Sequence, residues 1–304
     1  MPENEVANRA RIIRSMGFAP AHEPEKVLSA AASGLDAVGA DLEDLTPGSE
    51  KRRAREVFRD LARELRSRGT LVMARTNDLG AGCEEDLAAI VCPELHCVNV
   101  PKARSAAQVR EFCGLLEEAE RRNRVPPGSV LVRPVIETAE GVRNAFEIAS
   151  ASPRVTYMGG VAGGFWGDLG ATLGLITGPD GMESYFLRAK ILVDVRAAGV
   201  RFPIGGGGIS NREPAAIKEF AWQNKRLGYT GMYTRADAET VAAIHEVFTP
   251  TPEEVREWRE VLPELEKAER EGTICVFIGS RMYDTAGIPR VRDLLELADR
   301  VGVG

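Results

Sequence analysis

The chain has 304 residues, of which 44% are hydrophobic and 28% are charged, enough apolar material for a large buried core. The net charge of -6 at pH 7 and the absence of a basic face argue against nucleic acid as a partner, and no apolar run is long enough to be a membrane span or a secretory signal. Five cysteines, an odd number without a Cys-x-x-Cys pair, indicate reduced thiols and hence a cytoplasmic protein.

Eight strand-like segments alternate with amphipathic helices along the chain. The clearest helix is predicted from Ser49 to Arg68, with an apolar stripe on one face and Gly69 as its stop. Apolar strands joined by helices imply parallel pairing covered on both faces. Eight repeats predict a (β/α)8 TIM barrel, and a doubly wound sheet is the alternative. The strands are expected at residues 12–21, 35–43, 70–76, 96–102, 130–137, 154–163, 199–207 and 229–236.

The pattern changes near residue 249. Thr251 and Glu254 have the spacing of a capping box, with Pro252 at the first helical position. A short apolar piece and a final amphipathic helix follow, and neither is needed by a minimal barrel. We therefore expect a barrel over residues 1–248 and a C-terminal helical extension, or lid, over residues 249–304 of the same functional unit.

Charged residues close one predicted strand after another. The carboxyl ends of parallel strands meet at one side of such a fold, and ligands bind there. Each residue has an ordinary alternative, because an aspartate can cap a helix and a lysine or arginine can pair with a nearby acid. Their shared position nevertheless favours an active site assembled from strand ends. The residues are Asp41, Glu43, Asp44, Arg75, Lys102, Glu137 and Asp168.

Two of these carboxylates, Glu137 and Asp168, come from different strand ends and suit a hard divalent cation. Magnesium prefers one or two protein carboxylates, with waters and substrate oxygens completing its shell. Arg75 would then hold a substrate carbonyl or carboxylate and help the metal to stabilise an enolate. That combination suits making or breaking a carbon–carbon bond next to a carbonyl.

Taken together, these motifs resemble the citrate lyase β-subunit-like family, which includes the malyl-CoA, β-methylmalyl-CoA and citramalyl-CoA lyases. The order and spacing of the motifs carry the resemblance. They are Asp41-Leu-Glu-Asp44, Arg75-Thr-Asn77, Pro101-Lys102, Ile136-Glu-Thr138, Gly167-Asp-Leu169, Phe248-Thr-Pro-Thr-Pro-Glu-Glu254 and Gly279-Ser-Arg-Met282 with Asp284. The resemblance implies a barrel enzyme that forms homotrimers or hexamers.

The resemblance also assigns roles to individual residues. It implies that Glu137 and Asp168 bind Mg2+, and that Arg75 stabilises the enolate. It further implies that Asp284 reaches a neighbouring subunit's site as acid or base. We also expect Glu43 and Asp44 to take part in catalysis. Substrate-binding residues are expected to be Arg75, Lys102, Gly167 and Asp168.

One departure from the family pattern concerns the substrate. Family members usually carry a His-Pro pair after the eighth strand, where this chain has Ala236 and Asp237. Whether CoA is used therefore stays open. The expected function is a Mg2+-dependent carbon–carbon lyase acting on a 3-hydroxy acid or its CoA thioester. The alternatives are a thioester hydrolase on the same scaffold, a pyruvate-dependent aldolase of a 2-oxo acid, and a non-catalytic relative that binds a small acid.

Overall fold

The computed structural model describes residues 9–160, 168–206 and 213–304. The chain forms two compact units, Met1–Glu246 and Val247–Gly304. Among the described residues, no helix is both long and apolar enough to cross a membrane. All five cysteines lie in the described part and are free thiols.

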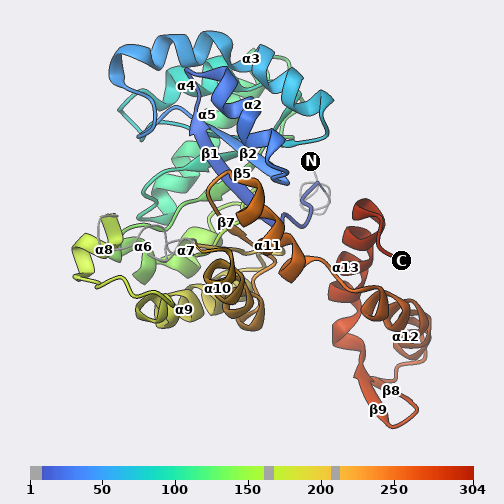
Figure 1. Ribbon diagram of the computed structural model, residues 1–304. Helices are drawn as coiled ribbons and strands as arrows, with labels where there is room; N and C mark the ends of the chain where they lie inside the picture. The colour runs from blue at the N-terminus through green and yellow to red at the C-terminus, as the bar shows by residue number, and fades with distance from the viewer. Residues whose placement is uncertain (1–8, 161–167, 207–212) are drawn as a thin grey trace. The chain divides into compact units, whose positions relative to one another are not determined.

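The first unit is built on a curled sheet of seven parallel strands in the order β5-β4-β3-β2-β1-β7-β6 (Figure 1). The α/β class and the parallel pairing expected from the sequence are confirmed. The strands are β1 (Ser15–Pro20), β2 (Ala37–Asp41), β3 (Leu71–Arg75), β4 (Leu95–Val100), β5 (Leu131–Pro134), β6 (Ile204–Gly205) and β7 (Gly231–Tyr233).

The sixth predicted strand forms only part of a strand ladder in its described residues. The Val132 N–H of β5 donates to the Arg154 carbonyl at 2.9 Å, and Val132 makes an isolated parallel bridge to Val155. On the other side, the Ile204 N–H of β6 donates to the Met158 carbonyl at 3.3 Å. The segment from Arg154 to Met158 is therefore hydrogen-bonded to both end strands of the sheet without being a regular strand itself.

Helices connect the strands and contact one another in the succession α2, α3, α4, α5, α7, α9 and α10. The helix predicted from Ser49 to Arg68 is present as α3, and Phe58 and Leu65 on its apolar stripe are fully buried. The helices of this unit are α2 (Pro24–Ala32), η1 (Gly48–Glu50), α3 (Lys51–Ser67), α4 (Cys83–Ile90), α5 (Ala106–Arg122), α6 (Ala139–Arg143), α7 (Ala145–Ala149), α8 (Asp168–Leu173), η2 (Met182–Ser184), α9 (Tyr185–Ala197), α10 (Pro214–Leu227) and α11 (Ala238–Phe248), whose last residues reach the second unit.

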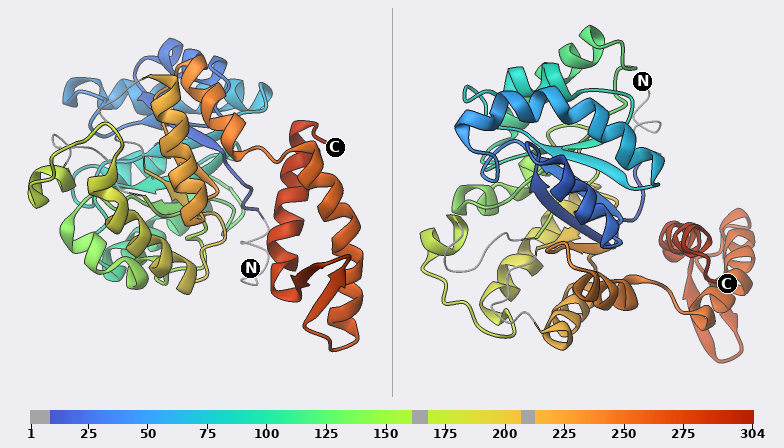
Figure 2. Two further views of the ribbon diagram at one scale, coloured as in Figure 1. Left: turned by 60° about the horizontal axis from the view of Figure 1, so that its bottom comes forward. Right: turned by 45° about the horizontal axis from the view of Figure 1, so that its top comes forward.

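The second unit pairs two helices with a small hairpin, and Figure 2 shows these helices side by side. The predicted capping box is confirmed, because Thr251 Oγ1 accepts the Glu254 N–H and Glu254 Oε2 accepts the Thr251 N–H. The apolar piece after it folds as an antiparallel hairpin rather than as a barrel strand. The elements are α12 (Pro252–Arg270), β8 (Cys275–Ile278), β9 (Arg281–Asp284), η3 (Thr285–Gly287) and α13 (Ile288–Val301).

Candidate active site

Arg75 and Asp41 form the centre of a group of ion pairs at the carboxyl ends of β2 and β3. These two residues are neighbours in the sheet register. Arg75 Nε donates to Asp41 Oδ1 at 2.8 Å and Nη2 donates to Oδ2 at 2.7 Å, while Nη1 lies 3.0 Å from Glu43 Oε2. Asp41 also accepts the backbone N–H groups of Glu43 and Leu45, so one buried carboxylate orients both the guanidinium and the turn that follows.

Lys102, at the end of β4, connects this group to two further carboxylates. Its Nζ lies 3.2 Å from Glu43 Oε1, 3.8 Å from Asp44 Oδ1 and 3.6 Å from Asp168 Oδ2. Its backbone N–H donates to Glu137 Oε1 at 2.9 Å. The residue has φ 46°, a left-handed conformation that non-glycine residues rarely adopt. Such strain often marks a functional position.

We call these six residues the ion-pair cluster. They are Asp41, Glu43, Asp44, Arg75, Lys102 and Asp168. Four carboxylates face two cations here, and Glu137 adds a fifth, so the ends of these strands carry an excess of negative charge. The described residues contain no group of three or more His, Cys, Asp or Glu side chains set to hold a metal without other ligands. A cation here would need water or substrate oxygens, as Mg2+ does.

Burial perturbs the titration of this region. It raises the pKa of Glu43 and of Glu137, although nearby cations oppose the effect in both cases. For Arg75, burial alone would lower the pKa, but the hydrogen bonds and charge of Asp41 raise it overall. For Lys102, burial alone would likewise lower the pKa, but the charge and the hydrogen bond of Glu43 raise it overall. The two cations therefore stay charged, and each of the two glutamates takes up a proton more readily than an ordinary glutamate does.

A second layer of hydrogen bonds holds the turn after β2 in place. Lys51 Nζ donates to the Leu42 carbonyl, to the Glu43 carbonyl at 2.7 Å and to Asn77 Oδ1 at 2.8 Å. Asn77 in turn donates to the buried Asp86 from both its backbone N–H and its amide. Lys51 and Asn77, the last residue of the Arg75-Thr-Asn77 motif, thus position the acids without being part of the ion-pair cluster.

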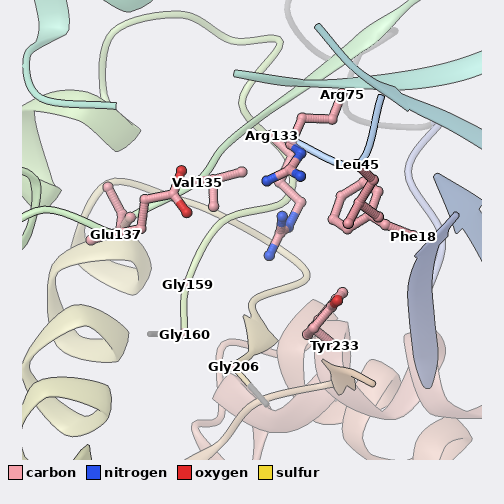
Figure 3. A pocket seen from close by; sticks show the side chains of 11 residues that line it. Phe18, Leu45, Arg75, Arg133, Val135, Glu137, Gly159, Gly160, Gly206 and Tyr233 are labelled. Atoms are coloured by element: carbon pink, nitrogen blue, oxygen red, sulfur yellow. The ribbon is translucent and has the colours of Figure 1, made fainter. Parts of the chain in front are cut away.

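A cavity of about 250 Å³ lies beside Arg75 and Glu137. Figure 3 shows Glu137 on one side of it, Phe18 and Tyr233 on the other, and the side chains of Arg75 and Arg133 between them. The lining residues are Phe18, Leu45, Arg75, Arg133, Val135, Ile136, Glu137, Gly159, Gly160, Gly206 and Tyr233.

Glycines let the walls of this cavity approach closely. A Cβ on Gly39 would lie 2.2 Å from the ring of Phe18, and that ring packs against the Arg75 guanidinium at 5.1 Å. Gly160 has φ 76°, and a Cβ there would lie 2.1 Å from the Gly206 backbone nitrogen. Side chains at these positions would displace the groups that line the cavity.

The structure brings together most of the residues that the sequence predicted for the site: the ion-pair cluster and Glu137. Gly167 lies outside the described residues. Asp284 lies in the second unit, where it is exposed and its Oδ1 accepts the Ala286 N–H as the cap of η3. Asp237, one of the two residues at the family's His-Pro position, accepts the Thr240 N–H at the start of α11 and pairs with Arg235.

Sequence reasoning missed Arg133, Phe18 and Tyr233. Phe18 and Tyr233 belong to strands whose aromatic residues fit an ordinary core. Arg133 carried a usable signal, because it is the only charged residue in the apolar run from Val130 to Ile136. A charge within an otherwise buried strand is expensive unless it has a partner, so it marks a position worth testing.

Comparison with known proteins places the chain among lyases. Residues 14–235 match the HpcH/HpaI aldolase/citrate lyase family. The chain is 31% identical to the citrate lyase subunit beta of Escherichia coli K12 over 297 residues, covering 97% of this chain and 96% of that protein. It is 29% identical to the L-malyl-CoA/beta-methylmalyl-CoA lyase of Cereibacter sphaeroides over 317 residues, with 96% of each protein covered.

Solved structures give the same result. The crystal structure of protein CitE from Mycobacterium tuberculosis in complex with magnesium, acetoacetate and coenzyme A superposes with a TM-score of 0.65 at 26% identity, covering 96% of this chain and 99% of that one. A citrate lyase from Burkholderia xenovorans LB400 superposes with a TM-score of 0.72 at 19% identity, covering 97% and 94%, and supports the fold alone. The chain belongs to the HpcH/HpaI aldolase/citrate lyase family.

Proposed function

We propose that the protein is a Mg2+-dependent carbon–carbon lyase that acts on a 3-hydroxy acid or its CoA thioester. The observation that carries this proposal is the cavity in which Arg75 and Glu137 face each other beside the ion-pair cluster (Figure 3). The excess of carboxylates calls for a cation, and the arginine provides donors for a developing oxyanion. Relatives that match nearly the whole chain are lyases.

Glu137 and Asp168 are the residues that would hold Mg2+. Burial is the main cause of the raised pKa of Glu137, and repulsion from Asp168 adds to it. A cation bound between the two carboxylates would instead lower that pKa. Glu137 Oε1 is already fixed by the Lys102 N–H, and the Asp168 side chain is 55% exposed and free to meet an incoming ion. When bound, the metal supplies Lewis-acid polarisation of a substrate oxygen.

The remaining residues bind and orient the substrate. Arg75 is held rigidly by Asp41, so its guanidinium is pre-organised to stabilise negative charge on the substrate carbonyl oxygen. Lys102 binds a substrate carboxylate next to Asp168. Glu43, whose pKa is raised by burial and whose Oε2 is paired with Arg75 Nη1 at 3.0 Å without a well-directed hydrogen bond, is suited to proton transfer, and Asp44 assists it.

We infer that the curled sheet is closed into a (β/α)8 barrel. The support comes from the segment between Arg154 and Met158, which hydrogen-bonds to β5 on one side and to β6 on the other. This segment would then occupy the position of the eighth strand of the barrel. On this proposal residues 1–248 form the barrel, and residues 249–304 form its extension or lid.

Asp284 is proposed to act as acid or base in the site of a neighbouring subunit of a homotrimer or hexamer. Its exposure and its place at the end of a hairpin make it accessible to a partner chain. The capping bond to Ala286 occupies one carboxylate oxygen and leaves the other available. The free thiols agree with a protein of the cytoplasm, whose partners are small acids or acyl-CoA molecules.

A product assay tests the proposed function. The full-length protein is incubated with Mg2+ and, in separate reactions, citrate, malyl-CoA and citramalyl-CoA, and release of oxaloacetate, glyoxylate or pyruvate is followed as the phenylhydrazone. We expect a 2-oxo or aldehyde acid to appear from at least one of them and to disappear with excess EDTA. Free CoA without a carbonyl product would instead indicate thioester hydrolysis and contradict the lyase assignment.

A further inference from the structure

Arg133 is an arginine of the cavity to which the proposed reaction gives no role. It lies in β5, next to Asn99 of β4 in the sheet register, and only 4% of its surface is exposed. Figure 3 shows its side chain extending toward the same part of the cavity as that of Arg75. Glu137, four residues further along the chain, lines the same cavity.

Among the described residues, Arg133 has one hydrogen-bond partner. Its Nη1 donates to Asn99 Oδ1 at 3.1 Å. Its Nε is buried and has no hydrogen-bond partner, and its guanidinium forms no ion pair with a described carboxylate. Glu137 lines the same cavity but forms no ion pair with Arg133, and its Oε1 accepts the Lys102 N–H.

Other buried arginines of this protein show what a fully satisfied guanidinium looks like. Arg154 forms a bidentate pair with Glu120, at 2.9 and 2.7 Å. Arg188 has no carboxylate partner in the described part of the chain, but its guanidinium nitrogens donate to four different oxygens and it packs over the ring of Phe220 at 4.4 Å. Of these three, only Arg133 has an enclosed guanidinium nitrogen, Nε, without a hydrogen-bond partner among the described residues, and its side chain lines a cavity.

An arginine in this state lacks an anion. A guanidinium stays protonated even when burial lowers its pKa, as it does for Arg133. A buried charge without a counter-ion lowers the stability of the fold unless other interactions offset its cost. A carboxylate that entered the cavity would meet Nη2, which makes no hydrogen bond to a described residue, whereas Nε is enclosed by the protein and out of its reach.

We propose that Arg133 is a specificity-determining residue that binds a second carboxylate of the substrate, so that the carbonyl fragment released or accepted by the enzyme is a 2-oxo dicarboxylic acid. This inference rests on the proposed function, because it presumes that the first carboxylate and the oxo group bind at the metal beside Arg75. The substrate class is therefore narrowed from hydroxy acids in general to those with an additional carboxylate beyond the reacting carbons.

Equilibrium dialysis with Mg2+ tests the proposal on the full-length protein. Two matched pairs of acids serve as probes: oxaloacetate with 2-oxobutyrate, and 2-oxoglutarate with 2-oxopentanoate. Within each pair the chain length is equal and only the terminal carboxylate differs. We expect the wild-type protein to bind at least one dicarboxylate roughly 10²-fold more tightly than its partner, since a buried charge left unpaired penalises the analogue that lacks the group.

Variants of Arg133 and Asn99 test whether Arg133 causes the preference for dicarboxylates. Arg133→Met should bring the affinity ratio close to one, and Arg133→Lys should retain part of it. Asn99→Asp places a carboxylate against the guanidinium and should also bring the affinity ratio close to one, although Arg133 itself is unchanged. This variant keeps the test valid if Arg133→Met does not fold. Arg52→Met, which removes an exposed arginine of α3, serves as the charge control and should leave the ratio unchanged.

The outcomes separate this inference from the proposed function. Mg2+-dependent binding of all four acids without a preference for either dicarboxylate would overturn the role of Arg133 and leave the lyase proposal standing. A preference that survives both Arg133→Met and Asn99→Asp would also overturn it. Failure of every acid to bind in the presence of Mg2+ would overturn the proposed function, and this inference with it.

Discussion

Two regions of one cavity solve the problem of a buried arginine in opposite ways. At the ion-pair cluster, Arg75 is neutralised by the protein itself through Asp41 and Glu43. Beside it in the same cavity, Arg133 has a single amide oxygen as partner and no carboxylate among the described residues (Figure 3). The first arrangement fixes a catalytic group in place before the substrate arrives, whereas the second leaves a charge for the substrate to neutralise.

The two arginines also meet two different requirements of one active site, catalysis and substrate selection. A group that stabilises charge developing during the reaction must be rigid, and its own counter-ions provide that rigidity. A group that selects between substrates gains most when the wrong ligand leaves it unsatisfied. Stability is expected to reflect this division, with Arg75 supporting the fold and Arg133 weakening it.

The largest effect on turnover is expected from replacing Glu137, the carboxylate that lines the same cavity as both arginines. Glu137→Gln removes a proposed Mg2+ ligand without changing the packed volume, so turnover should fall on the order of 10³-fold or more while the unfolding midpoint changes little. Glu140→Gln, three residues later and exposed, is the matched control and should keep wild-type turnover. Near wild-type activity of Glu137→Gln, or activity that survives exhaustive EDTA treatment, would show that the metal assignment is wrong.

The two arginines should differ sharply in their contribution to stability. Arg75→Met leaves Asp41 and Glu43 buried without their cation and should lower the free energy of unfolding by about 3–5 kcal/mol. Arg133→Met removes an unpaired charge, which offsets the lost hydrogen bond to Asn99, so its free energy of unfolding should stay within about 1 kcal/mol of wild type. Urea denaturation of both variants measures the difference. Equal losses would mean that Arg133 has a structural role after all.

Activity should distinguish the geometry of Arg75 from its charge. Arg75→Lys keeps a positive charge but loses the fork that pairs with Asp41 and faces Glu43, so kcat should fall on the order of 10²-fold. The comparison predicts that Arg133→Lys affects the choice of substrate more than kcat. Steady-state kinetics of the two lysine variants on the substrate found by the product assay checks this, and unchanged kcat for Arg75→Lys would remove Arg75 from the chemistry.

A smaller effect concerns whether the site is complete within one chain. Mixing the variants Asp284→Ala and Arg75→Ala, each nearly inactive, should restore roughly a quarter of the wild-type activity, because random hybrid oligomers contain that share of intact composite sites. Asp284→Ser is the matched control, since serine can still cap η3 but cannot act as an acid or base. Absence of complementation despite proven subunit exchange would place Asp284 in its own chain's site or outside the chemistry.

The smallest effect comes from His245, a half-buried base that, unlike Arg133, can give up its proton. Burial lowers the pKa of His245 to about 4, although Asp36 at 3.6 Å opposes the shift. Between pH 6.5 and 4 the unfolded chain therefore binds more protons than the folded one, and the free energy of unfolding should fall as the pH is lowered, by at most about 1.4 kcal/mol per pH unit from this residue.

The variant His245→Gln isolates that contribution. Glutamine can keep a hydrogen bond to Ser15 Oγ, which His245 Nε2 meets at 2.7 Å, but it does not titrate. The pH dependence of its unfolding should be flatter than that of wild type between pH 6.5 and 4 and parallel to it above pH 7.5. Parallel curves across the whole range would mean that His245 does not titrate in that window.

The sequence alone predicted the alternation of strands and helices, the capping box at Thr251 and the charges at strand ends. These features depend on local periodicity and on residues close together in the chain, so they can be read without knowing the fold. The motif order was also sufficient to identify the family. The sixth predicted strand forms no regular strand in its described residues, because the apolar run near Tyr157 resembles a strand but shares too few backbone hydrogen bonds with β5 and β6.

Only the tertiary structure decided which charges neutralise one another. Asp41 and Arg75 are 34 positions apart, and nothing local indicates that they form a bidentate pair while Arg133, among the residues that the structure describes, bonds only to Asn99. Pairing depends on sheet register and on which side of a strand faces the cavity, and both are set by contacts between distant segments. The free energy of a buried charge depends on its partners in space, so the sequence supplied the charged groups and the fold assigned their partners.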